Sequence, residues 1–360
     1  MRLGARPHRS DIPMLEQFMP VGYVYDPIYL EHDRDDHPEN SARLAAIIKY
    51  LCEVGLLSRL TPIPAEKAAL EDLVRVHDCR YIEFMRQLAE GGGGWPDSDT
   101  YANARSYEVA LYAAGGVIAA TRAVLNGEVD SAYALVRPPG HHATRNGAEG
   151  FCLFNNVAVA TAWALASAKV SRVAIVDLDV HHGNGTQEAF WDDSRVLFAS
   201  THQYGGGFYP GTGHWREKGS NGNCLNIPLP PHTGDAGYMQ AFQWLVEPAV
   251  RRFRPELIMV SAGYDGHWAE RLFRTAMLLS LTGYRRLMDS LVSLTHELCG
   301  GRLVLALEGG YDLRVLACGV ADAFRALLGL PSEDPLGPAG EQEVSVGEYL
   351  KAIARWHELQ

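Results

Sequence analysis

The chain has 360 residues, of which 47% are hydrophobic and 21% are charged, and its formal net charge is -11 at pH 7. This composition is typical of a soluble globular enzyme and excludes disordered and fibrous proteins. The negative charge predicts no nucleic-acid partner, because nucleic-acid binding usually requires a basic patch. A cationic substrate would suit the charge better.

Targeting signals and disulfide patterns are not evident in the sequence. No stretch approaches the roughly 18 consecutive apolar residues of a membrane span, and residues 1–10 have no apolar segment behind their arginines. We therefore expect a cytoplasmic protein without a membrane partner. The six cysteines are scattered and form no C-x-x-C pair, which predicts reduced thiols. The sequence leaves the oligomeric state open, and a homo-oligomer is compatible with it.

Short apolar runs alternate with helical patterns along most of the chain. The runs predict strands at 21–25, 131–136, 173–179, 196–200, 224–228, 257–261 and 303–307. The helical patterns lie at 41–53, 106–126, 156–168, 237–253 and 282–299. Several runs are apolar on both faces, as in parallel strands that helices cover. We predict one α/β domain at 21–330, with a mainly parallel sheet flanked by helices, after an N-terminal extension at 1–20 and before a connector and helix at 331–360.

The predicted strand at 173–179 ends in ionisable side chains. Asp177, Asp179 and His181 lie on one face, because side chains alternate along a strand. Buried carboxylates are costly unless they are paired or bind a metal, and Asp179 with His181 suits zinc or iron. Asp265 follows the predicted strand at 257–261 and is the expected third ligand, since ligands of such sheets bind at the carboxyl ends of the strands. The alternative is a salt-bridged or helix-capping cluster, which the combined D-x-D-x-H-H-G-N-G run makes less favourable.

Two adjacent histidines follow the strand at 131–136. In the run Arg137-Pro-Pro-Gly-His-His, the prolines and the glycine predict a tight loop that presents His141 and His142 together. Histidine titrates near neutral pH, so the pair suggests proton transfer beside a metal. Asp177 and Asn184 are available as acceptors that would fix the imidazole tautomers. The alternative is a surface loop with two solvated histidines.

The last predicted strand ends in Leu307-Glu-Gly-Gly-Tyr-Asp312. The two glycines allow the backbone to approach a ligand closely. The hydroxyl of Tyr311 at that position could donate a hydrogen bond to a developing oxyanion.

These motifs together resemble those of the zinc-dependent histone deacetylase superfamily, which includes acetoin-utilisation and acetylpolyamine amidohydrolases. Within this superfamily, the sequence resembles class II-like bacterial histone deacetylase-like amidohydrolases. The resemblance spans about Tyr23 to Leu330 and rests on residues 37–43, 137–142, 150–156, 173–186, 209–213, 261–265 and 308–311. The resemblance implies an arginase/deacetylase-like fold with the active site at the carboxyl ends of the strands.

The resemblance also implies roles for individual residues. It makes Asp179, His181 and Asp265 the ligands of Zn²⁺, for which Fe²⁺ could substitute. It implies that His142 is the general base and acid and that Tyr311 polarises the scissile carbonyl. His141 would be the electrostatic partner of His142, and Asp177 would hold His141 in place. A structural K⁺ or Na⁺ ion would bind the backbone carbonyls of Asp177, Asp179 and His181.

The substrate would enter a tunnel. By the resemblance, Gly150, Phe151 and Tyr209 form its wall, Asp99 grips the substrate backbone at the rim, and Leu272 takes the gatekeeper position. Three features depart from the family pattern. Asn184 stands where class I members have Asp, Tyr209 replaces a common Phe, and Glu270-Arg-Leu272 replaces an Asp-Pro-Leu run.

The expected function is a zinc-dependent amidohydrolase that removes an acyl group, most simply acetyl, from an amine such as acetyl-lysine. An acetylpolyamine or another small amide is the alternative substrate, and the apolar Leu272 slightly favours acyl-lysine. A non-catalytic metal-containing binding protein is a further alternative, which the presence of Tyr311 and both histidines disfavours. An arginase-like ureohydrolase would need a second metal and further Asp/His pairs, which 264–268 does not provide.

Overall fold

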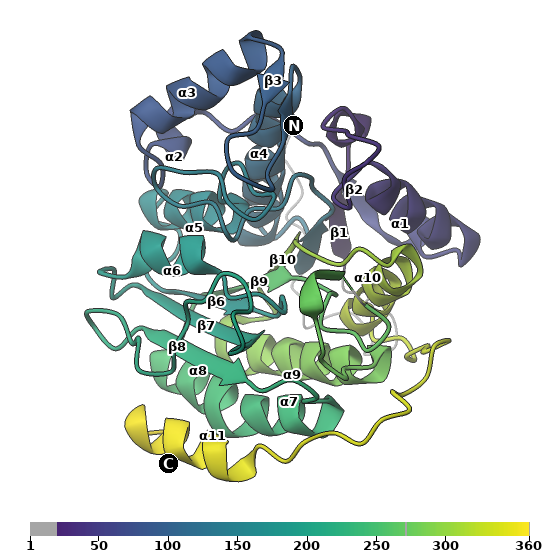
Figure 1. The fold of residues 1–360 in the computed structure, drawn as a ribbon, viewed down its shortest axis with the longest axis vertical. Helices are drawn as coiled ribbons and strands as arrows, with labels where there is room; N and C mark the ends of the chain where they lie inside the picture. The colour runs from purple at the N-terminus through teal and green to yellow at the C-terminus, as the bar shows by residue number, and fades with distance from the viewer. Residues whose placement is uncertain (1–19, 271, 360) are drawn as a thin grey trace, which may run out of the picture.

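A single sheet of eight parallel strands organises the computed structural model, which describes residues 20–270 and 272–359 (Figure 1). The strand order is β2-β1-β5-β10-β9-β6-β7-β8, and every neighbouring pair is parallel. The strands are β1 (Val21–Val24), β2 (Thr61–Ile63), β5 (Ser131–Ala134), β6 (Val173–Asp177), β7 (Val196–Gln203), β8 (Cys224–Leu229), β9 (Leu257–Ala262) and β10 (Leu303–Leu307). The predicted α/β domain with a mainly parallel sheet is confirmed.

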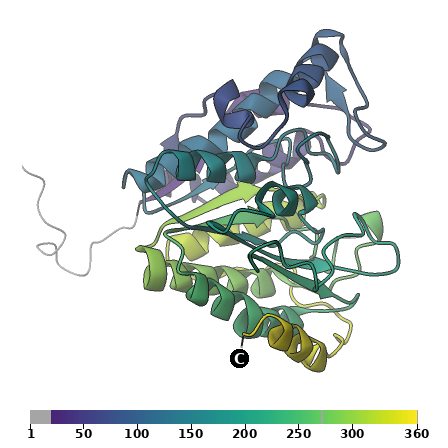
Figure 2. The ribbon, with the colours of Figure 1, turned by 90° about the vertical axis from the view of Figure 1, so that its left-hand side faces the viewer.

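The central strands are buried along their whole length, because helices cover both faces of the sheet (Figure 2). On one side, α4 (Ser106–Leu125) packs on β5 and against α5 (Asn156–Ala166). On the other, α9 (Leu281–Cys299) packs on β9 and against α10 (Leu313–Leu327). The carboxyl ends of β5, β6, β9 and β10 therefore lie side by side at one edge.

The remaining α-helices and strands extend these layers. They are α1 (Ala42–Glu53), α2 (Leu70–Leu73), α3 (Cys79–Glu90), α6 (Asn184–Phe190), α7 (Asp235–Ala241), α8 (Glu247–Phe253), α11 (Gly347–Trp356) and the small hairpin of β3 (Gly93–Gly94) and β4 (Ala102–Asn103). The helix expected at 237–253 is α7 and α8 joined by a π-helical turn at 242–246. Several elements have no counterpart among the predicted ones, namely the short edge strand β2, the hairpin of β3 and β4, and the helices α2, α3, α6 and α10.

Helix α4 is long and apolar enough to cross a membrane by length and composition, with a mean hydropathy of 1.4 over 18 residues. In the structure, 72% of that window is buried inside the protein, as expected for a helix of the core. Its composition is therefore weak evidence for a membrane span.

The segment after α10 lies outside the sheet. The predicted extension at 1–20 falls outside the described residues except for Pro20. After α10 the chain runs without a helix to α11, and the Glu343 carboxylate accepts hydrogen bonds from the backbone amides of Gly234, Ala236 and Gly237.

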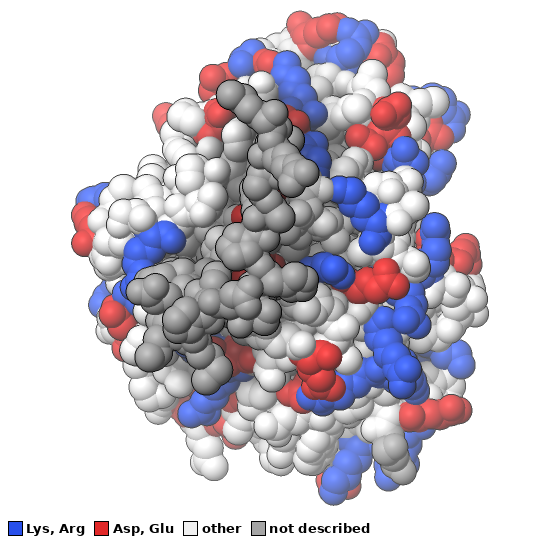
Figure 3. Space-filling view, turned by 180° about the vertical axis from the view of Figure 1, so that it is seen from behind, with Lys and Arg blue, Asp and Glu red and all other residues white. Residues whose placement is uncertain are grey.

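All six cysteines are free thiols, as predicted. Where grey atoms do not cover it, the face in Figure 3 carries mixed basic and acidic side chains.

Candidate active site

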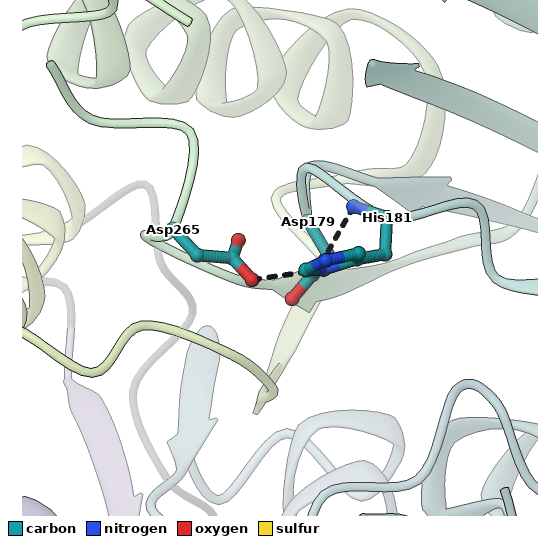
Figure 4. A group of neighbouring side chains, drawn as sticks. All are labelled: Asp179, His181 and Asp265. Atoms are coloured by element: carbon teal, nitrogen blue, oxygen red, sulfur yellow. Dashed lines mark hydrogen bonds and ion pairs between the residues drawn. The ribbon is translucent and has the colours of Figure 1, made fainter. Parts of the chain in front are cut away.

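Asp179, His181 and Asp265 converge at the carboxyl ends of the neighbouring strands β6 and β9 (Figure 4). His181 Nδ1 lies 3.1 Å from Asp179 Oδ1 and 3.1 Å from Asp265 Oδ2. All three side chains are buried, and one potential ligand atom of each lies within 4.8 Å of the others. Within residues 20–270 and 272–359, no other group of three His, Cys, Asp or Glu meets the same criterion. The three expected ligands therefore form one compact cluster.

Backbone groups and two glycines hold the carboxylates of this cluster in place. The amide of Gly309 donates to Asp179 Oδ2 at 2.9 Å, and the amide of Val180 donates to Asp265 Oδ1 at 3.1 Å. A Cβ on Gly309 would lie 2.5 Å from Asp265 Oδ2 and 2.6 Å from Asp179 Oδ2. A Cβ on Gly263 would collide with Asp179. Only glycine fits at these two positions.

The electrostatics of the cluster favour a bound cation. Burial raises the pKa of Asp265, and the charge of Asp179 raises it further, to about 6. Burial opposes protonation of His181, but its hydrogen bonds to the two carboxylates outweigh that effect and raise its pKa to about 9. Two buried carboxylates around one imidazole match the three protein ligands of a catalytic zinc site. The residues present therefore fit Zn²⁺.

The two adjacent histidines lie beside this cluster and contact the two acceptors that the sequence offered. His141 Nδ1 lies 3.0 Å from Asp177 Oδ2, and His142 Nδ1 lies 2.7 Å from Asn184 Oδ1. Both rings are buried, and their centroids are 4.0 Å apart. The alternative of a solvated surface loop is therefore wrong.

The environments of the two imidazoles push their pKa values apart. Burial would lower the pKa of His141, but the charges of Asp177 and Asp179 outweigh it and raise that pKa to about 10. For His142, burial and then the charge of His141 lower the pKa well below its ordinary value. One ring is thus charged and the other neutral near pH 7, which is the arrangement expected of an acid/base pair.

Glu308 binds the backbone of the loop that carries His141 and His142, a role that the sequence did not reveal. Its Oε2 accepts hydrogen bonds from the amides of Gly140 at 2.7 Å and His141 at 3.1 Å. Burial raises the pKa of Glu308 to about 7. The motif Leu307-Glu-Gly-Gly-Tyr contains this residue, but nothing in the motif indicates that its carboxylate binds the loop that follows β5.

Two contacts hold Tyr311 at the cavity, one from a carboxylate to its backbone amide and one from a guanidinium to its ring. Its amide donates to Glu270 Oε2 at 2.7 Å, and the amide of Asp312 donates to the same oxygen at 2.8 Å. The guanidinium of Arg43 lies 4.9 Å from the centre of the Tyr311 ring. Burial raises the pKa of Tyr311 well above its ordinary value, so the phenol stays protonated and can donate.

A cavity of about 90 Å³ connects these groups to the surface. Its lining includes Asp99, Pro139, His141, His142, Gly150, Phe151, Asp179, His181, Tyr209, Phe273, Gly309 and Tyr311. The structure thus brings four of the five expected substrate contacts to the cavity. The centroids of the Tyr209 and His142 rings are 5.0 Å apart, and the two rings are nearly perpendicular.

Leu272, the fifth expected contact, does not line the cavity, and the following residue, Phe273, takes its place. Phe273 adopts a positive φ of 56°, and its ring centroid lies 5.5 Å from those of Phe151 and Tyr311. The local backbone turn decides which residue faces inward, and the sequence gives no direct signal for that turn. Arg271 lies outside the described residues.

Comparisons with known proteins agree with this geometry. The histone deacetylase domain family matches residues 37–327. A "probable deacetylase" of Archaeoglobus fulgidus is 43% identical over 301 residues, which cover 82% of each chain. The histone deacetylase-like amidohydrolase of Pseudomonas aeruginosa is 41% identical and covers 92% of this chain and 85% of its own. The solved HD domain of HDA15 has a TM-score of 0.85, 34% identity and 94% coverage of both chains.

Family membership follows from the extent of these matches. The domain match spans most of the chain, and relatives above 30% identity cover more than two thirds of both partners. The cluster of two Asp and one His, the histidine pair and the tyrosine all lie inside the matched region. The chain therefore belongs to the histone deacetylase family and is a hydrolytic deacetylase that acts on acylated amines.

Proposed function

We propose that this chain is a zinc-dependent deacetylase that removes an acetyl group from the side chain of acetyl-lysine or a closely similar amine. The observation that carries the proposal is the 90 Å³ cavity whose wall holds metal-ligand candidates, a paired set of histidines and a protonated tyrosine. These groups surround one cavity, so a single acyl-amine group that enters it could meet all of them.

Asp179, His181 and Asp265 would hold the zinc ion. When bound, zinc would supply Lewis acidity, polarising the acyl carbonyl and making a neighbouring water more acidic. Fe²⁺ is an alternative with similar ligand preferences. We also propose a structural K⁺ or Na⁺ ion bound to the backbone carbonyls of Asp177, Asp179 and His181, which lie at the end of β6.

His142 would move the proton. Because its Nδ1 contacts Asn184 and the ring is neutral, Nε2 is the nitrogen left to accept a proton from the attacking water. The same nitrogen would then give that proton to the departing amine, so that water is consumed and acetate and a free amine are produced. The charged His141, fixed by Asp177, would stabilise negative charge that develops nearby.

Tyr311 would donate its phenol hydrogen to the carbonyl oxygen as that oxygen becomes an oxyanion. We expect Tyr311→Phe to lower kcat by about 10²- to 10³-fold, the cost of one lost oxyanion donor. Steady-state turnover of an acetyl-lysine peptide and of N-acetylputrescine, each with wild type and variant, checks both the role and the substrate. Tyr349→Phe, a similar change in α11, should leave kcat unchanged.

The same experiment separates the candidate substrates. Preferred turnover of the peptide supports lysine deacetylation, while preferred turnover of the diamine would move the function to polyamine metabolism. Asp99 lines the cavity, and the charge of Asp97 acts on both Asp99 and Glu149, so negative charge gathers near the cavity and keeps cationic polyamines as the second candidate. No turnover of either compound by the zinc-loaded wild type would contradict the proposed function.

Glu270 is expected to support catalysis by holding Tyr311. Glu270→Ala leaves the amides of Tyr311 and Asp312 without their acceptor, which would let the phenol shift. We expect kcat to fall by up to about 10²-fold, because small displacements of catalytic groups have effects of that size. Zinc content, measured by atomic absorption, should not change. Glu270→Gln keeps an acceptor oxygen and should lose less, and equal losses in both variants would contradict the explanation.

A further inference from the structure

A half-buried carboxylate adjoins the hydrogen bond between His142 and Asn184. Asn184 Oδ1 lies 2.7 Å from His142 Nδ1, while Asn184 Nδ2 donates to Glu149 Oε2 at 3.0 Å. His142, Asn184 and Glu149 therefore form one chain of side chains that runs from the cavity wall to a half-buried carboxylate. Neither the family resemblance nor the ligand cluster accounts for the last member of this chain.

The backbone at Glu149 is fixed against the catalytic histidine. Glu149 and Cys152 exchange two backbone hydrogen bonds, of 3.2 and 2.9 Å, around Gly150 and Phe151, which have φ values of 53° and 71°. The amide of Phe151 also donates to Thr100 Oγ1 at 2.9 Å. A Cβ on Gly150 would collide with the His142 ring. This tight turn brings the Glu149 side chain to the same place whenever the site is formed.

The hydrogen-bonding capacities in the chain allow only one arrangement. An ionised carboxylate can only accept, so Glu149 draws the NH₂ group of Asn184 toward itself. The amide oxygen of Asn184 must then face His142, and Nδ1 of that ring must carry the hydrogen. In a neutral ring with its hydrogen on Nδ1, Nε2 keeps a free lone pair. If the Asn184 amide were reversed, its NH₂ group would favour the opposite tautomer, in which Nε2 is protonated and cannot act as a base.

We propose that Glu149 is a positioning residue that sets the tautomer of His142 by fixing the orientation of the Asn184 amide. The inference rests on the proposed function, in which His142 is the general base. Glu149 touches neither the zinc ligands nor the reacting atoms and acts through Asn184.

The surroundings of Glu149 set the conditions of a test. Burial raises its pKa, the hydrogen bond from Asn184 opposes that rise, and Asp97, Glu188 and Asp99 add to it. The carboxylate must be ionised to act only as an acceptor. Experiments at about pH 8, far above the ordinary value for Glu, keep it so.

The first test observes the tautomer directly. Zinc-loaded protein labelled with ¹⁵N-histidine gives separate signals for protonated and unprotonated ring nitrogens, and a His142→Gln spectrum assigns the His142 signals. We expect wild type to show Nδ1 protonated and Nε2 unprotonated. In Glu149→Leu, which has no acceptor, we expect a mixture of the two tautomers. An unchanged tautomer in Glu149→Leu would overturn the proposal, and this measurement requires no turnover.

The second test uses the opposite hydrogen-bonding needs of Asn and Asp at position 184. With Asn184, Glu149→Leu should lower kcat roughly tenfold, and Glu149→Gln, which retains an acceptor oxygen, should lower it less. Asn184→Asp places two carboxylates face to face. In that background Glu149→Gln supplies an amide donor to Asp, so the double variant should have a higher kcat than the single Asn184→Asp variant. The same substitution thus has opposite effects in the two backgrounds.

The kinetic outcomes distinguish the proposal from its rivals. Equal loss in both backgrounds would mean that Glu149 has only a structural role and would overturn the proposal. A raised KM for a cationic substrate with kcat unchanged in Glu149→Leu would assign Glu149 to substrate contact and would also overturn it. Inactive wild type with the expected tautomer shift would contradict the proposed function while supporting the positioning role.

Discussion

Asp265→Asn is expected to abolish stoichiometric zinc binding and to reduce deacetylase activity to background, while the metal-free protein remains folded. The substitution removes one of only two carboxylates in the cluster, so the remaining donors carry less charge and lower affinity. The amide oxygen of Asn can still accept from Val180, which preserves the local backbone.

The thermal stability of metal-free Asp265→Asn should not fall, although its activity should. The pKa of Asp265 is raised from 3.8 to about 6 in the folded protein, so its folded form binds the proton more tightly than its unfolded form. This group therefore costs stability progressively as pH rises from 3.8 to about 6, and the full cost is present above that range. Metal-free Asp265→Asn should consequently have a Tm at pH 7 no lower than that of the metal-free wild type.

Zinc titration followed by calorimetry and thermal melts checks both parts. Wild type should gain Tm when zinc is added, whereas the variant should not. Asp289→Asn removes an exposed carboxylate on α9 that pairs with Arg285 and should behave as wild type in zinc binding. A variant that still binds one zinc and turns over substrate would show that Asp265 is not a ligand.

His142→Ala should lower kcat by about 10²- to 10⁴-fold, the range for loss of a general acid/base. Wild-type kcat/KM should stay constant down to pH 6.5 and fall only below it. The reason is that burial and the charge of His141 lower the pKa of His142 from 6.5, and only the neutral ring can accept a proton. The residual activity of the variant should not show this acidic decline.

A pH–rate profile with a measured zinc content tests this role. His296→Ala, which changes an exposed histidine in the last turn of α9, should leave the profile unchanged. An acidic decline centred above pH 6.5, or one that persists in His142→Ala, would assign the proton transfer to another group.

The sequence predicted the parts of the site that follow directly from strand ends. Asp179, His181 and Asp265 come just after buried runs, and parallel strands place their carboxyl ends at one edge. The acceptors of the two histidines were also predicted, because Asp177 and Asn184 flank the same strand end.

What the sequence could not predict depends on contacts between distant residues or on local turns. Glu270 and Glu308 bind backbone amides of other segments, and no side-chain pattern encodes an amide partner. Phe273 rather than Leu272 reaches the cavity because of a positive φ, which aromatic residues rarely adopt. The edge strand β2 contains a proline and has only three residues, too few for a periodic pattern.

The pairing of β6 with β9 has a consequence for how the protein matures. His181 and Asp265 are 84 positions apart in the chain and meet only when β6 pairs with β9. Tyr311 follows β10, which is synthesised later and pairs with the other side of β9. A nascent chain that has emerged only to its middle holds an incomplete donor set and no oxyanion donor. The three candidate ligands therefore come together only after β9 has paired with β6, and the oxyanion donor joins them only after β10 has been added to the sheet.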